Sequence, residues 1–94
     1  MSYKASLHAV IHGHVQGVFF RAFVVEKARE LNLTGYVRNL PSGNDVEVRA
    51  EGDKNDLTIL IQYLKVGPAG ARVEEISINW SKYSEKYSHF SIRN

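Results

Sequence analysis

The segment with the greatest chemical potential is Gly13–Arg21, GHVQGVFFR, although it contains no nucleophile and no cluster of metal ligands. Its two glycines permit positive φ, so successive backbone N–H groups can turn toward one point. If a helix begins here, its first unpaired N–H groups add the positive end of a dipole. Arg21 adds a planar fork of donors that matches phosphate or carboxylate oxygens. The pattern predicts an anion cradle, most naturally for phosphate.

The glycine spacing matches neither of two common nucleotide-binding loops. No Gly-Lys-Ser/Thr follows, as a Walker A loop requires, and the segment lacks the GxGxxG of dinucleotide-binding domains. An ordinary strand-to-helix turn with an exposed arginine accounts for the same residues equally well. The choice between the two readings depends on the elements around the segment.

Hydrophobic periodicity predicts those elements. We expect strands at residues 6–12, 34–40, 45–51 and 73–81, a short last strand with Phe90 and Ile92, and helices at 20–31 and after residue 53. Asn32 is a plausible left-handed end for the first helix, Asp53 can cap the second, and Gly67-Pro68 ends it. In the fourth strand, Trp80 alternates with two isoleucines and is expected to pack in the core or to face the helices.

The order βαββαβ with a short final strand is typical of an α+β, ferredoxin-like sandwich. We expect one domain over residues 1–94, with two helices packed on one face of an antiparallel sheet. The other face is expected to be polar. This fold hosts many functions, so it does not by itself identify one.

Titratable residues on the polar face do not form an evident second site. His8 and His12 are about 13 Å apart along one strand, too far to share a metal ion. Glu47 and Glu51 are similarly separated, so we expect solvated side chains rather than an acid–base pair. His14 is expected to be an exposed polar residue.

Composition restricts the compartment and the partners. The chain has 94 residues, a formal net charge of +2 and no cysteine, so it has no disulfide framework and no thiolate chemistry. It lacks a signal-peptide apolar run and the roughly 20 apolar residues that span a bilayer. No run of Lys and Arg suggests nucleic acid as a partner. We expect a cytoplasmic protein without a membrane partner.

Two segments carry a family resemblance. Ile11–Arg21 resembles the first signature of the acylphosphatase family, G-x-V-Q-G-V-x-F-R, and Gly35–Asn39 (GYVRN) resembles the second. The similarity continues through Ala50–Asp53 and Gly67–Glu75. Both signatures fall where the family has them, after the first strand and in the second.

The resemblance implies hydrolysis of small acyl phosphates to a carboxylate and inorganic phosphate, by a monomer without metal, cofactor or phosphoenzyme. Arg21 and the loop N–H groups are expected to bind the phosphoryl group, and Asn39 to orient the attacking water. The loop residues so implied are Val15, Gln16, Gly17, Val18, Phe19 and Phe20. Arg38, on the opposite strand face from Asn39, is expected to be structural.

One departure and several alternatives stay open. Both Asn44 and Asp45 stand between Gly43 and Val46, where the family has one residue, so a longer turn tip or a bulge is expected. The alternatives are a non-catalytic phosphate- or RNA-binding module and the acylphosphatase-like domain of a carbamoyl-transferring enzyme. RNA binding favours exposed aromatic residues on the central strands, which this sequence lacks. Carbamoyl-transferring domains belong to long chains.

Overall fold

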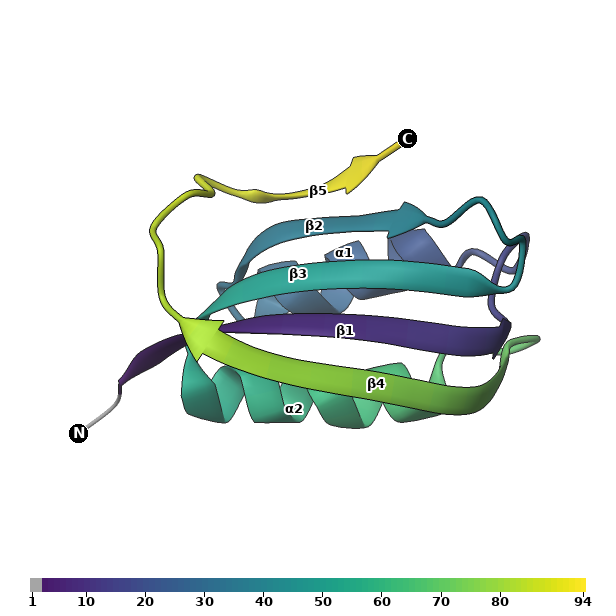
Figure 1. The fold of residues 1–94 in the computed structure, drawn as a ribbon, viewed down its shortest axis with the longest axis horizontal. Helices are drawn as coiled ribbons and strands as arrows, with labels where there is room; N and C mark the ends of the chain where they lie inside the picture. The colour runs from purple at the N-terminus through teal and green to yellow at the C-terminus, as the bar shows by residue number, and fades with distance from the viewer. Residues whose placement is uncertain (1–2) are drawn as a thin grey trace.

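The computed structural model describes residues 3–94, which form five strands and two helices (Figure 1). Their order is β1 (Lys4–His14), α1 (Phe20–Glu30), β2 (Thr34–Asn39), β3 (Asp45–Asp53), α2 (Lys54–Val66), β4 (Arg72–Lys82) and β5 (Phe90–Arg93). The predicted βαββαβ order with a short final strand is confirmed. Strands β1, β3 and β4 extend one to two residues beyond the alternating pattern at one end or both, because backbone pairing continues past the buried side chains, whereas β2 ends one residue earlier than expected, at Asn39.

The sheet has the order β4-β1-β3-β2-β5. The four long strands pair antiparallel, as predicted, but β5 runs parallel to β2 and makes the sheet mixed. The chain leaves β4 at one edge and crosses to the other edge before β5 begins, as Figure 1 shows. Because β5 is reached by this crossing and not by a hairpin, its direction is not fixed by a tight turn.

The core lies between the sheet and the helices, which both cover one face (Figure 1). The predicted inward side chains of β1 and β3 are fully buried, as are most residues of the apolar stripes of both helices, whereas Leu31 at the end of the α1 stripe is partly buried. These side chains are Leu7, Ala9, Ile11, Val46, Val48 and Ala50 on the strands, and Phe20, Val24, Ala28, Leu57, Leu60 and Leu64 on the helices. Burial of these alternating and helical patterns is the main favourable term for the fold.

The predicted helix boundaries are confirmed by local geometry. Asp53 Oδ1 accepts a hydrogen bond from the Asn55 N–H at 2.9 Å, which caps α2. Gly67 ends α2 with a φ of 73° and donates its N–H to the Tyr63 carbonyl. Asn32 follows α1 with a φ of 58°, in the left-handed region.

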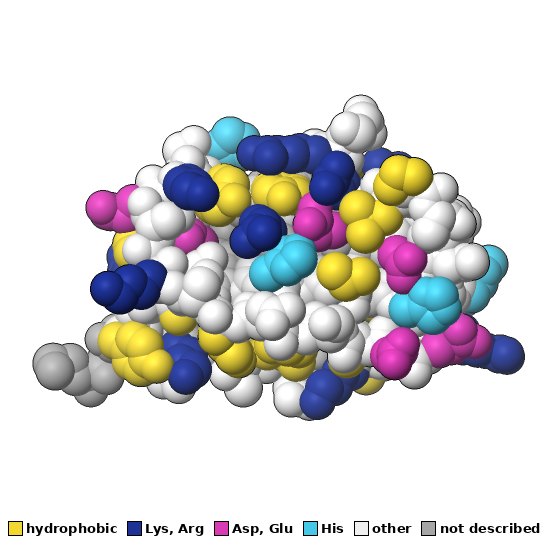
Figure 2. All heavy atoms as spheres, in the orientation of Figure 1, with side chains coloured by type: hydrophobic (Ala, Val, Ile, Leu, Met, Phe, Trp, Pro, Cys, Tyr) yellow, Lys and Arg dark blue, Asp and Glu magenta, His cyan; other side chains and the backbone are white. Residues whose placement is uncertain are grey.

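The two outward glutamates are buried, so the expectation that they are solvated is wrong. Hydrogen bonds from His8, Tyr36 and Arg38 surround the Glu47 carboxylate. The Glu51 carboxylate is covered by the segment that crosses from β4 to β5, where Ser84 donates both its N–H and its hydroxyl to Oε2. Figure 2 shows the outer face on which charged and histidine side chains are interspersed. Side-chain cover over a sheet face depends on distant contacts that alternation does not encode.

Trp80 lies on the predicted face but is not a core residue. It pairs with Leu7, whose side chain is completely buried, yet Trp80 is 41% exposed. Edge strand β4 leaves it at the rim of the helical layer, where the Lys54 Nζ lies 5.1 Å from its ring centroid. The expected helix-facing position is therefore confirmed, and the alternative of full burial in the core is wrong for this side chain.

Gly35 tests how closely β2 and β3 approach. Its φ is 137°, and an added Cβ would stand 1.9 Å from the Arg49 carbonyl oxygen. Gly35→Ala should reduce the free energy of unfolding by about 3–5 kcal/mol, because backbone atoms must move apart. Urea denaturation measures this loss.

Gly43→Ala is the matched control for this substitution. Its φ of 86° is also positive, but apart from its two chain neighbours no described residue has an atom within 4 Å of the added Cβ. The expected cost is about 1–2 kcal/mol, from backbone strain alone. Equal losses in the two variants would contradict the close approach at Gly35.

Candidate active site

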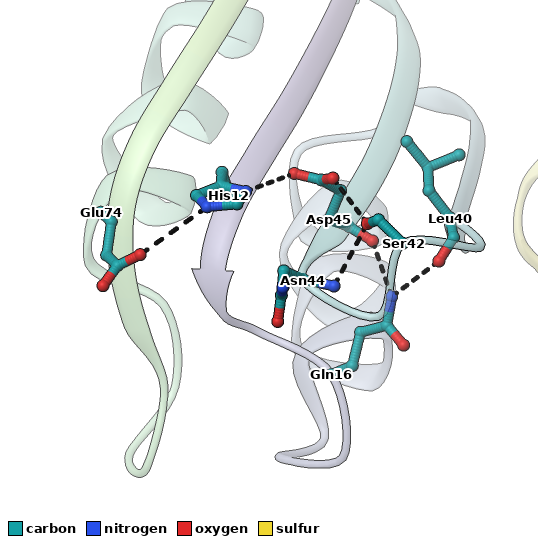
Figure 3. Close-up of polar contacts among 7 residues, drawn as sticks. All are labelled: His12, Gln16, Leu40, Ser42, Asn44, Asp45 and Glu74. Carbon is teal, nitrogen blue, oxygen red and sulfur yellow. Dashed lines mark hydrogen bonds and ion pairs between the residues drawn. The ribbon is translucent and has the colours of Figure 1, made fainter.

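The loop between β1 and α1 meets the turn between β2 and β3 at one end of the sheet (Figure 1). The side-chain amide of Gln16 joins them. Its Nε2 donates to the carbonyl oxygens of Leu40 at 3.0 Å and Asp45 at 2.9 Å, as Figure 3 shows. Asn39 directly precedes Leu40, so these bonds set the distance between the loop and Asn39.

The loop backbone has the conformation expected of an anion cradle. Positive φ alternates along it, 75° at Gly17 and 61° at Phe19, which turns successive N–H groups toward one side. Phe19 is the N-cap of α1, and no side chain among residues 3–94 caps this helix end. The first turn of α1 contains Arg21 and, over its described residues, no acidic side chain. The helix start therefore favours an anion.

Gly13 has a different role from the predicted one. It belongs to β1, where the pairing with β4 shifts register between His12 and Gly13. Its φ is 142°, and an added Cβ would lie 2.1 Å from the Arg72 carbonyl oxygen. Gly13 thus permits a β-bulge beside the cradle, not the curl of the cradle itself.

A cavity of about 280 Å³ opens between the loop and the end of β2. Its lining residues are Val15, Gly17, Phe19, Phe20, Arg21, Ala22, Asn39 and Ile92. The cavity therefore brings Arg21 and Asn39 together with four of the six loop residues implied by the resemblance. Gln16 and Val18 lie outside the lining: Gln16 bonds the hairpin, and Val18 packs against the core.

Arg21 and Asn39 both have unused bonding capacity. Arg21 Nη1 donates to the neutral Asn94 Oδ1 at 3.2 Å in an exposed contact. No carboxylate among residues 3–94 pairs with this guanidinium. Asn39 Oδ1 is buried and accepts no hydrogen bond from any described residue. A buried acceptor without a partner is costly, and a water or ligand donor would satisfy it.

The sequence did not identify two lining residues, Ala22 and Ile92. Ala22 follows Arg21 directly and is exposed in the first turn of α1, so its place next to Arg21 in the sequence could have indicated that it lines the cavity. Ile92 comes from β5, opposite Val37 in the parallel pairing with β2. No local sequence signal places that strand beside Asn39.

The additional residue in the turn between β2 and β3 lies at the tip of the turn. Pairing of these strands is continuous from Thr34–Glu51 to Asn39–Val46, with no register shift. The additional residue therefore lies between residues 40 and 45, and the expected alternative of a bulge is excluded for this pair. Gly43 supplies the positive φ that the tip requires.

Comparison with known proteins identifies the family. The acylphosphatase family model matches residues 7–92. A curated acylphosphatase of Dehalococcoides mccartyi (strain ATCC BAA-2266 / KCTC 15142 / 195) is 47% identical over 87 residues, 93% of this chain and 96% of the relative. The chain belongs to the acylphosphatase family.

Solved structures agree with this assignment. The crystal structure of acylphosphatase from Bacillus subtilis superposes with a TM-score of 0.92 at 36% identity, covering 96% of this chain and 99% of that one. Full-length HypF, in its phosphate- and nucleotide-bound form, matches the whole chain with a TM-score of 0.86 at 27% identity, but over only 12% of its own length. The ferredoxin-like α+β architecture of the family is thus confirmed.

Other polar residues of this acylphosphatase-family chain belong to the outer face. Arg38 donates to Glu47 and points away from the cavity that Asn39 lines, as predicted. His8 also bonds Glu47, and His12 bonds Asp45. Among residues 3–94, no cluster of His, Cys, Asp and Glu has a geometry that could hold a metal ion, and neither helix is long and apolar enough to cross a bilayer.

His12 and Asp45 form a charged network next to the Gln16 contact (Figure 3). The His12 Nδ1–H donates to Asp45 Oδ1 at 2.8 Å, and Ser42 donates its hydroxyl to Oδ2 at 2.6 Å. The Asp45 hydrogen bond, with the charges of Asp45, Glu74 and Glu75, raises the pKa of His12 above its usual 6.5. The bonds from Ser42 and then His12 lower the pKa of Asp45 below its usual 3.8.

These pKa shifts predict a pH window for the network. The His12 contribution to stability is complete below pH 6.5 and is lost as pH rises through the raised pKa, whereas the Asp45 contribution is lost only as pH falls below 3.8. His12→Gln should therefore lower the thermal midpoint most between about pH 4 and 6.5, and the difference should shrink at alkaline pH. Thermal denaturation at a series of pH values measures it.

His14→Gln is the control for this series. The His14 side chain is exposed and makes no hydrogen bond or ion pair with any of residues 3–94. The thermal midpoint of the His14→Gln variant should equal that of the unmodified protein at every pH. A constant difference for His12→Gln across the whole range would contradict the charged network.

Proposed function

We propose that this chain hydrolyses acyl phosphates to a carboxylate and inorganic phosphate, with Arg21 and Asn39 in the reacting site. The observation that supports these roles is that Arg21 and Asn39 line one cavity at an uncapped helix start, and that the buried Asn39 oxygen has no partner among the described residues. The family and the acylphosphatase name of its curated members support the reaction class. The cytoplasmic location and the monomeric state suggested by the sequence stay predictions.

The phosphoryl group would occupy the cradle of residues 15–20. Backbone N–H groups at the positive end of α1 would receive its oxygens, and Arg21 would bind two of them with its planar fork. The present Asn94 contact to Arg21 is neutral and exposed, so a charged phosphoryl oxygen competes with it favourably. This gives the transferring group fixed donors where negative charge develops.

Asn39 would position the attacking water. Its buried Oδ1 accepts one water hydrogen, which directs the water oxygen toward phosphorus. An amide cannot take a proton, so the water proton passes to a phosphoryl oxygen of the substrate. The water O–P bond forms as the P–O bond to the acyl group breaks, and the carboxylate leaves with the electron pair. Positioning and charge stabilisation are the main requirements of such a loose transition state.

The leaving group explains how a site without a general acid can work. A carboxylate is the base of an acid with a pKa of about 4, so it departs without protonation. An alkoxide, nearer the value of about 16 for water, normally needs a proton donor or a metal ion. None of the residues that line the cavity has a carboxyl or imidazole group. The residues therefore favour an acid anhydride over a phosphate ester.

Asn39→Ala tests the water-positioning role. We expect turnover of benzoyl phosphate to fall roughly 10²–10³-fold, as on loss of one transition-state hydrogen-bond partner, while inhibition by inorganic phosphate changes little. Steady-state kinetics with EDTA present measures both quantities. Full turnover in this variant would refute the assignment of Asn39.

Two controls accompany that assay. Asn79→Ala removes an exposed asparagine from β4 and should leave turnover unchanged. EDTA should not affect the unmodified protein, and loss of its activity would contradict a metal-free reaction. Phosphate binding without turnover would instead favour the non-catalytic phosphate-binding alternative.

Arg21→Lys tests the phosphate clamp. Lysine keeps the charge but cannot form the planar two-point contact. We expect KM for acetyl phosphate and for benzoyl phosphate to rise about tenfold and kcat to fall, in line with the loss of a charge-assisted contact. Arg72→Lys, an exposed arginine on β4, is the matched control. An unchanged KM in Arg21→Lys would count against the clamp.

A further inference from the structure

Phe19 is an exposed aromatic residue at the mouth of the candidate active site. Its side chain is 86% exposed, the largest exposed fraction among the large hydrophobic residues described, yet it lines the cavity shared by Arg21 and Asn39. It belongs neither to the hydrophobic core nor to the residues packed against the core. Folding of the chain therefore gains little from this ring.

The backbone at Phe19 makes a large side chain there unfavourable. Its φ of 61° and ψ of 25° lie in the left-handed region, which bulky residues rarely adopt. Glycine would supply the same curl of N–H groups without steric cost. The cradle explains the conformation at this position, but neither the cradle nor the core explains the ring.

The rest of the cavity mouth is also apolar. Ala22 and Ile92 are exposed lining residues, and Ile92 retains 43% exposure at the end of β5. Arg21 is the only charged side chain in the lining, and the proposed function commits it to phosphate. The mouth therefore offers apolar contact and no charged partner for a group attached to the phosphate.

The direction of the reaction relates these residues to the substrate. In an in-line displacement, the attacking water and the leaving group lie on opposite sides of phosphorus. If the buried Asn39 oxygen holds the water, the acyl group extends away from it, out of the cradle. Phe19 belongs to the loop, across the cavity from the end of β2 that holds Asn39, so its exposed side chain is one that the acyl group would meet first, with Ile92 of β5 at the rim beside it.

We infer that Phe19 and Ile92 form a subsite for the acyl group, which makes the chain selective for acyl phosphates with aromatic or other large apolar acyl groups. This inference rests on the proposed function. A benzoyl ring can stack against Phe19 in an offset or edge-to-face arrangement, whereas an acetyl group offers one methyl. Even in a closed hydrophobic pocket one methylene changes selectivity by only about 10–200-fold, so at this exposed subsite a moderate preference is expected.

The experiment compares kcat/KM for benzoyl phosphate and acetyl phosphate. The unmodified protein should prefer benzoyl phosphate, and Phe19→Ala should reduce the ratio of the two kcat/KM values about fivefold, through loss of one ring contact. Phe19→Leu should retain part of the ratio because it restores apolar area. Phe19→Gly removes the ring and the backbone strain together, so it should reduce the ratio as Phe19→Ala does.

Two further variants identify the source of the effect. Ile92→Ala should reduce the same ratio by less, because it removes fewer apolar atoms. Val66→Ala, which shortens a 74% exposed side chain on α2 outside the cavity, should leave the ratio unchanged. Thermal denaturation of each variant confirms that the folded protein is being assayed.

The outcomes separate this inference from the function on which it depends. If kcat/KM fell by the same factor for both substrates in Phe19→Ala and Phe19→Leu, the residue would act through the loop backbone, and the subsite would be overturned. An unchanged ratio in all Phe19 variants would overturn it as well, with acyl phosphate hydrolysis intact. Hydrolysis of neither compound by the unmodified protein would overturn the proposed function and the subsite with it.

Discussion

The candidate site depends on one side-chain amide, that of Gln16. The sheet places β3 between β1 and β2, so the loop after β1 and Asn39 at the end of β2 are not neighbours through strand pairing. Gln16 Nε2 bridges this gap with bonds to the carbonyls of Leu40 and Asp45, one on each side of the turn. Both carbonyls are fixed by the backbone, so this side chain, together with the Gly13 N–H that donates to the Asn44 carbonyl at 2.9 Å, sets the position of the cradle relative to Asn39. Positioning of this kind supplies much of the rate in phosphoryl transfer.

The two arginines of the family signatures, Arg21 and Arg38, have partners of different charge. Arg38 is held by the Glu47 carboxylate on the outer face, where it stabilises a buried charge. Arg21 contacts only the neutral amide of Asn94 among its polar partners in residues 3–94. A guanidinium that is already paired with a carboxylate must give up that pair to bind phosphate. The outer network therefore satisfies the charges of the sheet, while Arg21 remains available to the cavity.

Much of this arrangement was accessible from the sequence because it is local. Alternating and helical periodicities located the strands and helices, and the two signatures placed Arg21 and Asn39 in one cavity. The direction of β5, and with it the place of Ile92, depends on a crossing between opposite edges of the sheet. Burial of Glu47 and Glu51 depends on partners from other strands and from the segment after β4. These are tertiary contacts, which periodicity does not report.

Three features that reduce the free energy of unfolding occur together at the cavity. Phe19 has a left-handed backbone, the start of α1 has no side-chain cap among residues 3–94, and the Asn39 oxygen is buried without a described partner. Each cost would be reduced by a more ordinary residue or a nearby donor, so none of them serves the stability of the fold. The continuous core between the sheet and both helices offsets these costs from a distance. An anion at the helix start and a water at Asn39 would satisfy the last two, so the unpaired polar groups at this end of the sheet support the proposed site.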